Sequence, residues 1–291
     1  MLKKSYYLII IIIISSVLAG CGDGSSGDSE AKGDNVNDSK WAEIQETGEL
    51  VVGTSGTLFA ASYYPKGSDK LTGYDAEVIR EIAKRLELNV KFEIIGIDGL
   101  LAAVNSNRID VAINDIEITD ERKKKFSFSE PYKYSFTSMI VRSEDLSGIK
   151  TLEDLKGKKA GGGATTVFSD IARHFGAEVK TYSNVANDVY LQDVANGRTD
   201  TVINDYYLQK LALKAITKFD IKIHPDLKFH PTEQGIVVHK DANKLMKKMN
   251  EALQEMREDG TLAKLSKKFY GGEDVSKKPE AQVREIEGLD L

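Results

Sequence analysis

Two Asn-Asp pairs are the residues whose types and spacing first suggest ligand binding. Asn114-Asp115 ends the segment 108–115, and Asn204-Asp205 ends the closely similar segment 198–205. Carboxamide and carboxylate groups can hydrogen-bond a polar ligand and bind its cationic groups. In both copies the pair follows a short apolar run, and open α/β sheets bind ligands at the carboxyl ends of their strands. We therefore expect facing walls of one cleft, although a single Asn-Asp pair would more simply end a strand and cap a turn.

The elements around these pairs indicate two similarly built α/β lobes, because a repeat of this length implies a repeated unit. A strand is expected over 49–54, and apolar positions recur with helical period after Asp75. A strand over 90–95 and a helix over 100–105 follow, and this alternation favours a parallel sheet. A polar aromatic loop is expected over 126–132.

The second half of the chain repeats this organisation. A strand over 136–142 leaves the first lobe, and Thr151 caps a short helix. The Gly/Thr run 159–166 is the counterpart of the first lobe's Gly/Thr/Ser loop. An apolar strand over 235–239 then leads into an amphipathic helix over 243–258.

We expect residues 41–138 and 235–272 to form lobe 1, residues 139–234 to form lobe 2, and residues 273–291 to form a mobile polar tail. The chain then crosses between the lobes twice, and two such crossings make a hinge.

The N-terminus indicates export and anchoring. Residues 1–20 have the layout of a signal peptide, with two lysines before an apolar run that is too short to span a membrane. Cys21, the one cysteine in the chain, follows small residues in a pattern that resembles the lipobox of bacterial lipoproteins. Residues 21–40 are mostly polar and read as a flexible tether. The net charge of −5 is spread along the chain, which argues against nucleic-acid binding.

The chain resembles the extracytoplasmic substrate-binding proteins of polar amino-acid ABC importers over about residues 41–271. Six short motifs carry the likeness in the correct order, and they lie at 71–75, 118–122, 128–132, 154–158, 197–200 and 259–262. The resemblance implies a type II periplasmic-binding-protein-like fold, with a ligand cleft between two α/β lobes. It also implies a monomer, lipid-anchored outside the cell membrane, that needs no cofactor and delivers its ligand to a permease and its ATPase.

The resemblance implies a binding site for a free amino acid. Arg122 matches the family arginine that grips the α-carboxylate, and Asp205 matches the aspartate that pairs with the α-ammonium. Thr119, Thr165 and Thr166 would add hydrogen bonds to the carboxylate. The alternatives are a surface arginine, an aspartate at a strand end and ordinary turn threonines.

The chain departs from the family pattern at two places. Phe59 or Tyr64 would replace the usual stacking aromatic of the first loop, and Ile97 completes the expected lining. Asp115 and Glu117 stand where the family has small or hydroxyl residues. These carboxylates could meet a second ammonium group, or they could be solvated or paired with a lysine.

The substrate implied by the resemblance is L-cystine or a related sulfur amino acid. Asn114-Asp115 resembles the Asn-Gln pair of cystine-importing relatives, and the whole chain is most similar to the Gram-positive lipoproteins for these ligands. L-Cystine carries two ammonium and two carboxylate groups, which suits additional acidic residues. A basic or other polar amino acid such as arginine, histidine or glutamine remains open.

Motifs for catalysis or metal binding are absent from the sequence. It contains no Gly-x-Ser-x-Gly or His-Glu-x-x-His, and its four histidines have no metal-ligand spacing. Gly161–Gly163 lacks the Gly-Lys-Ser/Thr of a phosphate loop. We therefore expect no enzyme, no metal and no cofactor. A dehydratase-like enzyme on the same fold, a sensor that serves a receptor kinase and a non-binding surface lipoprotein are the rival interpretations.

Overall fold

The computed structural model describes residues 39–183, 185–289 and 291. The expected signal peptide, Cys21 and residues 21–38 of the expected tether lie outside this part. Ser39 and Lys40 were also assigned to the tether, but they begin helix α1 (Ser39–Thr47). No helix of the described residues is both long enough and apolar enough to span a membrane.

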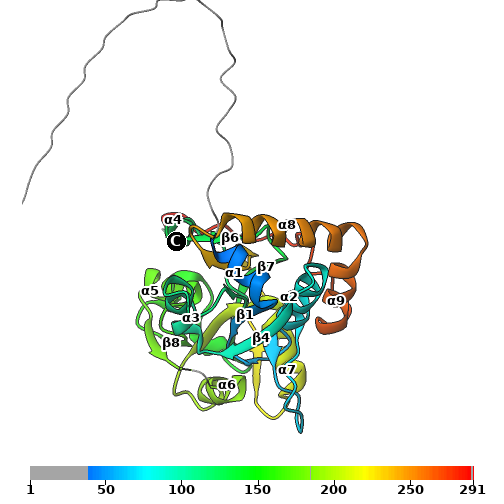
Figure 1. The fold of residues 1–291 in the computed structure, drawn as a ribbon. Coiled ribbons are helices and arrows are strands. Elements are labelled where there is room, and N and C mark those ends of the chain that lie inside the picture. The colour runs from blue at the N-terminus through cyan, green and yellow to red at the C-terminus, as the bar shows by residue number, and fades with distance from the viewer. Residues whose placement is uncertain (1–38, 184, 290) are drawn as a thin grey trace, which may run out of the picture. The chain divides into compact units, whose positions relative to one another are not determined.

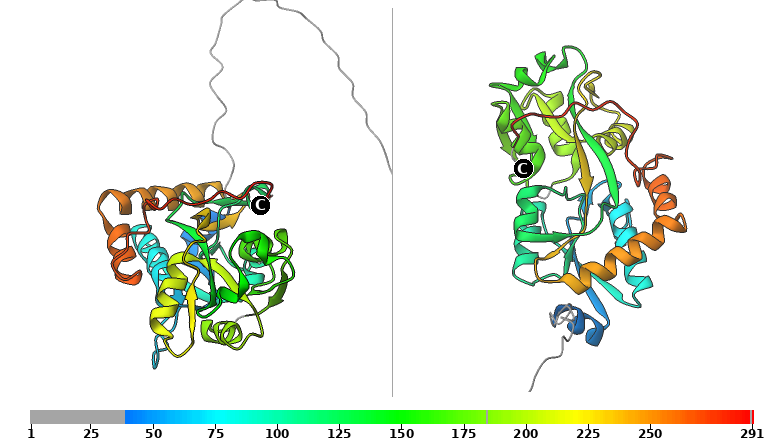
Figure 2. Two further views of the ribbon diagram at one scale, coloured as in Figure 1. Left: turned by 180° about the vertical axis from the view of Figure 1, so that it is seen from behind. Right: turned by 90° about the horizontal axis from the view of Figure 1, so that it is seen from above.

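Two sheets form the centres of two lobes (Figures 1 and 2). The order in the first sheet is β4 (Asn89–Ile94), β1 (Glu49–Thr54), β5 (Val111–Ala112), β13 (Val237–His239) and β6 (Phe126–Phe128). The order in the second is β11 (Ile221–Ile223), β7 (Lys133–Arg142), β10 (Thr201–Asp205), β8 (Lys159–Gly162) and β9 (Glu178–Thr181), with β12 (Phe229–Gln234) also paired to β7. This arrangement confirms the two-lobe α/β fold.

The repeated segments occupy equivalent places in the two sheets. β1 pairs in parallel with β4 and β5, and β8 pairs in parallel with β9 and β10. An antiparallel strand then follows on the other side, β13 beside β5 and β7 beside β10. The Asn-Asp pairs therefore follow or end corresponding strands, as the repeat predicted. The expected loop over 126–132 begins instead with β6, which pairs with β13.

Helices cover both sheets. Those of the first lobe are α1, α2 (Tyr74–Arg85), α3 (Ile97–Asn105), α4 (Asp120–Lys125), α8 (Asn243–Glu258) and α9 (Thr261–Phe269). Those of the second lobe are α5 (Val167–His174), α6 (Asn187–Ala195), α7 (Tyr206–Ala215) and the short 3₁₀ turns η1 (Leu146–Gly148) and η2 (Leu152–Leu155). In α8, apolar side chains at helical spacing are buried against α1, α2 and α9, while the lysines and glutamates of its other face are mostly exposed.

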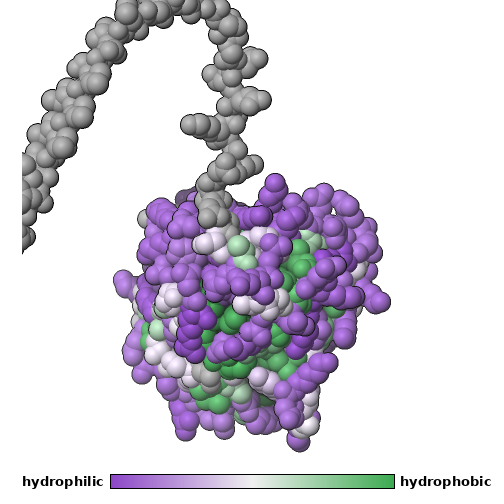
Figure 3. All heavy atoms as spheres, viewed as in Figure 1, coloured by the Kyte–Doolittle hydropathy of each residue, from purple (hydrophilic) through white to green (hydrophobic). Residues whose placement is uncertain are grey.

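The face of the molecule in Figure 3 is largely hydrophilic. Figure 3 shows apolar side chains near the middle of one face, over β1 and β4, surrounded by hydrophilic residues. A short hairpin of β2 (Thr57–Leu58) and β3 (Ser62–Tyr63) follows β1.

The paired strands β7 and β12 connect the two lobes. They run antiparallel, with Lys133 opposite Gln234 and Thr137 opposite Phe229. The chain reaches β7 from β6 of the first sheet and returns from β12 to β13. Two hydrogen-bonded crossings of this kind suit hinge motion between lobes. The lobe boundaries expected at residues 138/139 and 234/235 stay predictions.

The C-terminal segment packs against both lobes rather than extending as the mobile tail we expected. Val275 is fully buried in the core of the first lobe, and its carbonyl oxygen accepts a hydrogen bond from the Tyr134 amide at 2.8 Å. The His230 amide donates to the carbonyl oxygen of Arg284 at 2.8 Å, and Leu289 packs on the core of the second lobe. Figure 2 shows this red segment passing from α9 beside the crossing strands. The segment is mostly polar, and the prediction of a mobile tail overlooked the few apolar residues that pack it against the lobes.

Replacing Val275 with alanine tests this packing. Because the side chain is fully buried, its truncation should lower the free energy of unfolding by about 1–3 kcal/mol. Urea denaturation measures the change. The control is Lys277→Ala, since the Lys277 side chain is 79% exposed and should be nearly neutral. Equal stability of both variants would contradict the packing of Val275 in the core of the first lobe.

Candidate functional site

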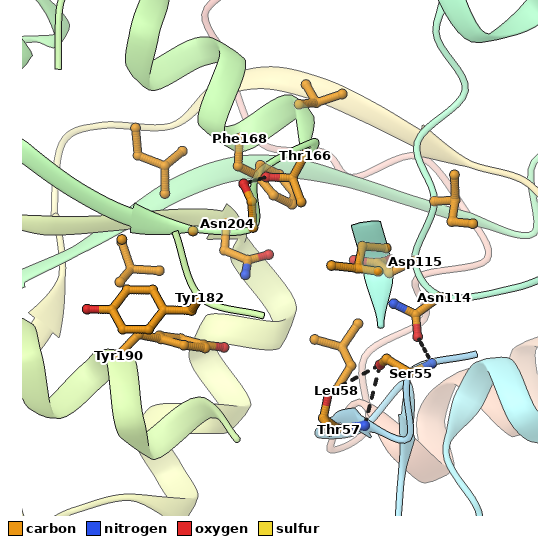
Figure 4. A pocket seen from close by; sticks show the side chains of 18 of the residues that line it. Ser55, Thr57, Leu58, Asn114, Asp115, Thr166, Phe168, Tyr182, Tyr190 and Asn204 are labelled. Carbon is orange, nitrogen blue, oxygen red and sulfur yellow. Dashed lines mark hydrogen bonds between the residues drawn. The ribbon is translucent and has the colours of Figure 1, made fainter. Parts of the chain in front are cut away.

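A cavity of about 140 Å³ lies between the carboxyl ends of the two sheets (Figure 4). Its walls come from both lobes. Ser55, Leu58 and Asn114 lie on one side, while Tyr182, Tyr190 and Asn204 lie on the other. Open α/β sheets bind ligands at the carboxyl ends of their strands, so this is the expected location of a ligand.

Six of the expected site residues line this cavity. They are Ile97, Asn114, Asp115, Glu117, Arg122 and Thr166. The others lie elsewhere: Thr119, Thr165 and Asp205 have different roles near the cavity, and Phe59 and Tyr64 line a second cavity.

Arg122 lies at the junction of the two lobes. Its Nη1 donates to the carbonyl oxygen of Glu117 at 2.8 Å, and its Nη2 donates to the carbonyl oxygen of Thr165 at 3.4 Å across the cleft. Thr119 accepts a hydrogen bond from the Arg122 amide, so it caps α4 and fixes the backbone beneath the guanidinium. Burial lowers the pKa of Arg122, and Glu117 and Asp170 partly oppose this effect. The guanidinium remains a cation suited to bidentate contact with a carboxylate.

Glu117 supplies an unpaired buried oxygen beside this cation. Its Oε1 lies 2.6 Å from Nε2 of His230, whereas Oε2 is buried without a hydrogen-bond partner among the described residues. An unpaired carboxylate oxygen in a buried place is costly, so a donor there would be favourable. Glu117 is also among the residues that line the cavity.

Asp205 is engaged inside the protein and does not line the cavity. Its Oδ2 accepts from Nζ of the fully buried Lys133 at 2.8 Å, and its Oδ1 accepts from the Leu208 amide and so caps α7. The Nζ of Lys133 also donates to Oδ1 of Asp115 at 2.5 Å. The structure thus corrects the expected role of Asp205, because both oxygens serve internal contacts. Asp115 is paired with a lysine, which is one of the alternatives that the sequence left open.

The pKa values of Asp115, Asp75 and Lys133 are shifted because these charged groups are buried close together. Burial raises the pKa of Asp115 to about 7 and that of Asp75 to about 6, while Lys133 acts in the opposite direction on both. Burial lowers the pKa of Lys133, but Asp115 and Asp205 raise it to a value above the ordinary one. Asp75 is tied to the group because its Oδ2 accepts from the Asp115 amide at 2.6 Å.

The Gly/Thr loop brings the second lobe against the first. The amide and hydroxyl of Thr165 both donate to Oδ1 of Asp98, at 3.0 and 2.8 Å, so Thr165 bridges the lobes instead of lining the cavity. Thr166 accepts from the Ser169 amide and caps α5. A Cβ at Gly163 would lie 3.3 Å from Cγ2 of Ile97, so glycine permits this close approach.

The sequence interpretation missed the aromatic wall on the second lobe. Tyr182 and Tyr190 line the cavity with ring centroids 6.0 Å apart. The Tyr182 hydroxyl donates to Asp193 at 2.5 Å, and a Cβ at Gly161 would lie 3.0 Å from the Tyr182 ring. Tyr182 follows the end of parallel strand β9, and it could have been identified because ligands of α/β sheets bind at strand ends. Tyr190 had no comparable signal because it lies within α6.

Hydrogen bonds also fix the first-lobe wall. Oδ1 of Asn114 accepts from the Ser55 amide at 2.8 Å and from the Thr54 hydroxyl at 3.0 Å. This repeat residue therefore shapes the loop after β1 as well as lining the cavity. Phe59 and Tyr64 follow that loop but face the second cavity. No group of three or more acidic, histidine or cysteine residues in the described ranges could hold a metal ion.

Residues 50–272 match the family model for bacterial extracellular solute-binding proteins, family 3. The chain belongs to this family. The probable ABC transporter extracellular-binding protein YckB of Bacillus subtilis is 54% identical over 93% of each chain. A crystal structure of that protein has a TM-score of 0.69 at 57% identity, covering 85% of this chain and 99% of the other. The L-cystine-binding protein TcyA of Bacillus subtilis is 38% identical over 95% of this chain and all of its own length.

Membership in family 3 establishes the general role. The chain is an amino-acid binding protein of an ABC transporter, and it acts outside the cytoplasm. It is not an enzyme, since its relatives are substrate-binding proteins.

The raised pKa of Asp75 predicts a pH dependence of stability. The folded protein retains a proton between pH 3.8 and about 6 that the unfolded chain has released. Stability from this group is therefore present below pH 3.8 and lost as the pH rises through about 6. Asp75→Asn should gain stability relative to the wild type between pH 4 and 7. Urea denaturation across that range measures the difference.

Asp69→Asn is the matched control, because Asp69 is exposed in the same lobe. Its stability relative to the wild type should stay nearly constant over the same range. A constant difference for Asp75→Asn as well would contradict the raised pKa.

Proposed function

We propose that this chain is the solute-binding lipoprotein of an ABC importer for L-cystine or a related sulfur amino acid. The observation that carries the proposal is the placement of two opposite charges in one interlobe cavity. Arg122 is a guanidinium at the lobe junction, and Glu117 has a buried oxygen without a described partner. A free amino acid carries the complementary carboxylate and ammonium on one carbon.

In the proposed binding mode, the α-carboxylate of the ligand meets the Arg122 guanidinium. The α-ammonium donates to Oε2 of Glu117. Charge-assisted hydrogen bonds of this kind are short and roughly twice as strong as neutral ones. Glu117 therefore takes the place that the sequence interpretation gave to Asp205, which is bound to Lys133.

The side chain of the ligand would extend between apolar and aromatic walls. Leu58, Phe168, Tyr182 and Tyr190 supply these surfaces. Sulfur makes favourable contacts with aromatic rings, so a disulfide or thioether suits this lining. The 38% identity to TcyA, which is described as L-cystine-binding, supports the same substrate class.

Ligand contact with both lobes would favour their closed arrangement, since a ligand stabilises the state that it binds better. The closed protein would deliver its ligand to a membrane permease, and the partner ATPase would supply the transport energy. We propose that a lipid on Cys21 anchors the protein as a monomer to the outer face of the cell membrane. No cofactor is needed for this role.

Arg122→Ala tests the binding mode. Truncating one partner of a buried charge pair typically costs 2–5 kcal/mol, so L-cystine affinity should fall by about 30-fold or more. Isothermal titration calorimetry measures the affinity. A thermal melt of the same sample checks that the variant is folded.

Arg173→Ala is the matched control. Arg173 donates to the carbonyl oxygen of Ala164 in the same Gly/Thr loop, but it does not line the cavity. Its loss should leave L-cystine affinity within about twofold of the wild type. Retained affinity in Arg122→Ala, or equal losses in both variants, would refute the assigned site.

A further inference from the structure

A second cavity, of about 360 Å³, lies beside the first. One wall is the β2–β3 hairpin of the first lobe with Phe59, Tyr63 and Tyr64, and the other comes from the second lobe. Thr57 lines both cavities, so they are neighbours. The second-lobe lining consists of Ala186, Asp188, Ala212, Ala215 and Ile216.

Asp188 is the charged residue of this lining. No other residue in the described part of the chain forms a hydrogen bond or ion pair with its carboxylate, and the side chain is partly buried. An acidic residue in the first turn of a helix is favourable in itself, and Asp188 occupies that place in α6. Its position opposite three aromatic side chains has no such explanation.

Aromatic faces around a carboxylate are suited to an organic cation. The rings of Phe59 and Tyr63 lie 5.0 Å apart, and Tyr64 is 42% exposed beside them. An ammonium group is attracted by the faces of such rings and by the carboxylate. The second cavity therefore has the composition of an ammonium site.

The two cavities also have an electrostatic connection. Burial and the nearby Asp188 carboxylate raise the pKa of Tyr190, which lines the first cavity. Asp188 thus lies close to the wall along which the ligand side chain would extend. In a disulfide the two α-carbons are usually about 4.4–6.8 Å apart, so the two ends of L-cystine need adjacent subsites.

We propose that the second cavity binds the distal ammonium group of a diamino acid whose first amino-acid group lies at Arg122 and Glu117. This inference rests on the proposed function and extends it, since L-cystine is such a ligand and S-methyl-L-cysteine is not. The distal ammonium pairs with Asp188 against the aromatic side chains. The distal carboxylate faces the open side of the cavity. The second cavity then distinguishes L-cystine from sulfur amino acids with a single charged end.

The test is calorimetric titration of the purified protein with L-cystine and with S-methyl-L-cysteine. Asp188→Asn should lower L-cystine affinity about tenfold, because the charged partner of the distal ammonium group is lost. It should leave S-methyl-L-cysteine affinity within about twofold of the wild type. Asp226→Asn, which removes an exposed charge from the same lobe, is the control and should change neither affinity.

A second pair of variants tests the aromatic wall. Tyr64→Leu should weaken L-cystine selectively, while Tyr64→Phe should retain its affinity because the ring face remains. An unchanged L-cystine affinity in Asp188→Asn, or equal losses for both ligands, would overturn the inference.

The wild-type titrations separate this inference from the proposed function. A wild-type protein that binds S-methyl-L-cysteine but not L-cystine would overturn the distal subsite and leave the amino-acid site intact. A wild-type protein that binds no amino acid would overturn both.

Discussion

The buried ammonium group of Lys133 is the interaction on which the rest of the structure depends. It donates to Asp115, after the repeat strand of the first lobe, and to Asp205, at the end of the repeat strand of the second. Lys133 also begins β7, one of the two crossing strands. Removing one partner of such a buried group leaves an uncompensated charge and typically costs 3–5 kcal/mol. This contact therefore joins both lobes and the hinge in one place.

This arrangement determines which charges remain for a ligand. Because Lys133 engages both repeat aspartates, the proposed binding mode assigns the charged contacts of the first cavity to Arg122 and the second oxygen of Glu117. They lie on the first lobe, while the second lobe contributes the aromatic side chains of Tyr182 and Tyr190. Such a division would let the first lobe orient the amino-acid group and the second lobe select the side chain.

Much of the fold could be predicted from the sequence, because local patterns determine local structure. The predicted helix over 243–258 coincides with α8, and the repeat predicted two equivalent lobes. Side-chain partners were harder to predict from the sequence, since contacts such as that of Lys133 with Asp205 join residues 72 positions apart. The sequence shows an aspartate at a strand end but not which cation it meets. The packing of the C-terminal segment could not be predicted for the same reason, because Val275 contacts the core of the first lobe only in the folded protein.

The most direct test of the account is a thermal-shift panel of the purified protein with L-cystine, cystathionine, S-methyl-L-cysteine, arginine, histidine and glutamine. A ligand at about 100 times its dissociation constant adds roughly 2.7 kcal/mol to stability. At this size that should raise the melting temperature by about 5–10 °C. We predict shifts with the sulfur amino acids and none of this size with the other three. A panel without any shift would contradict the assignment of the interlobe cavity as an amino-acid site.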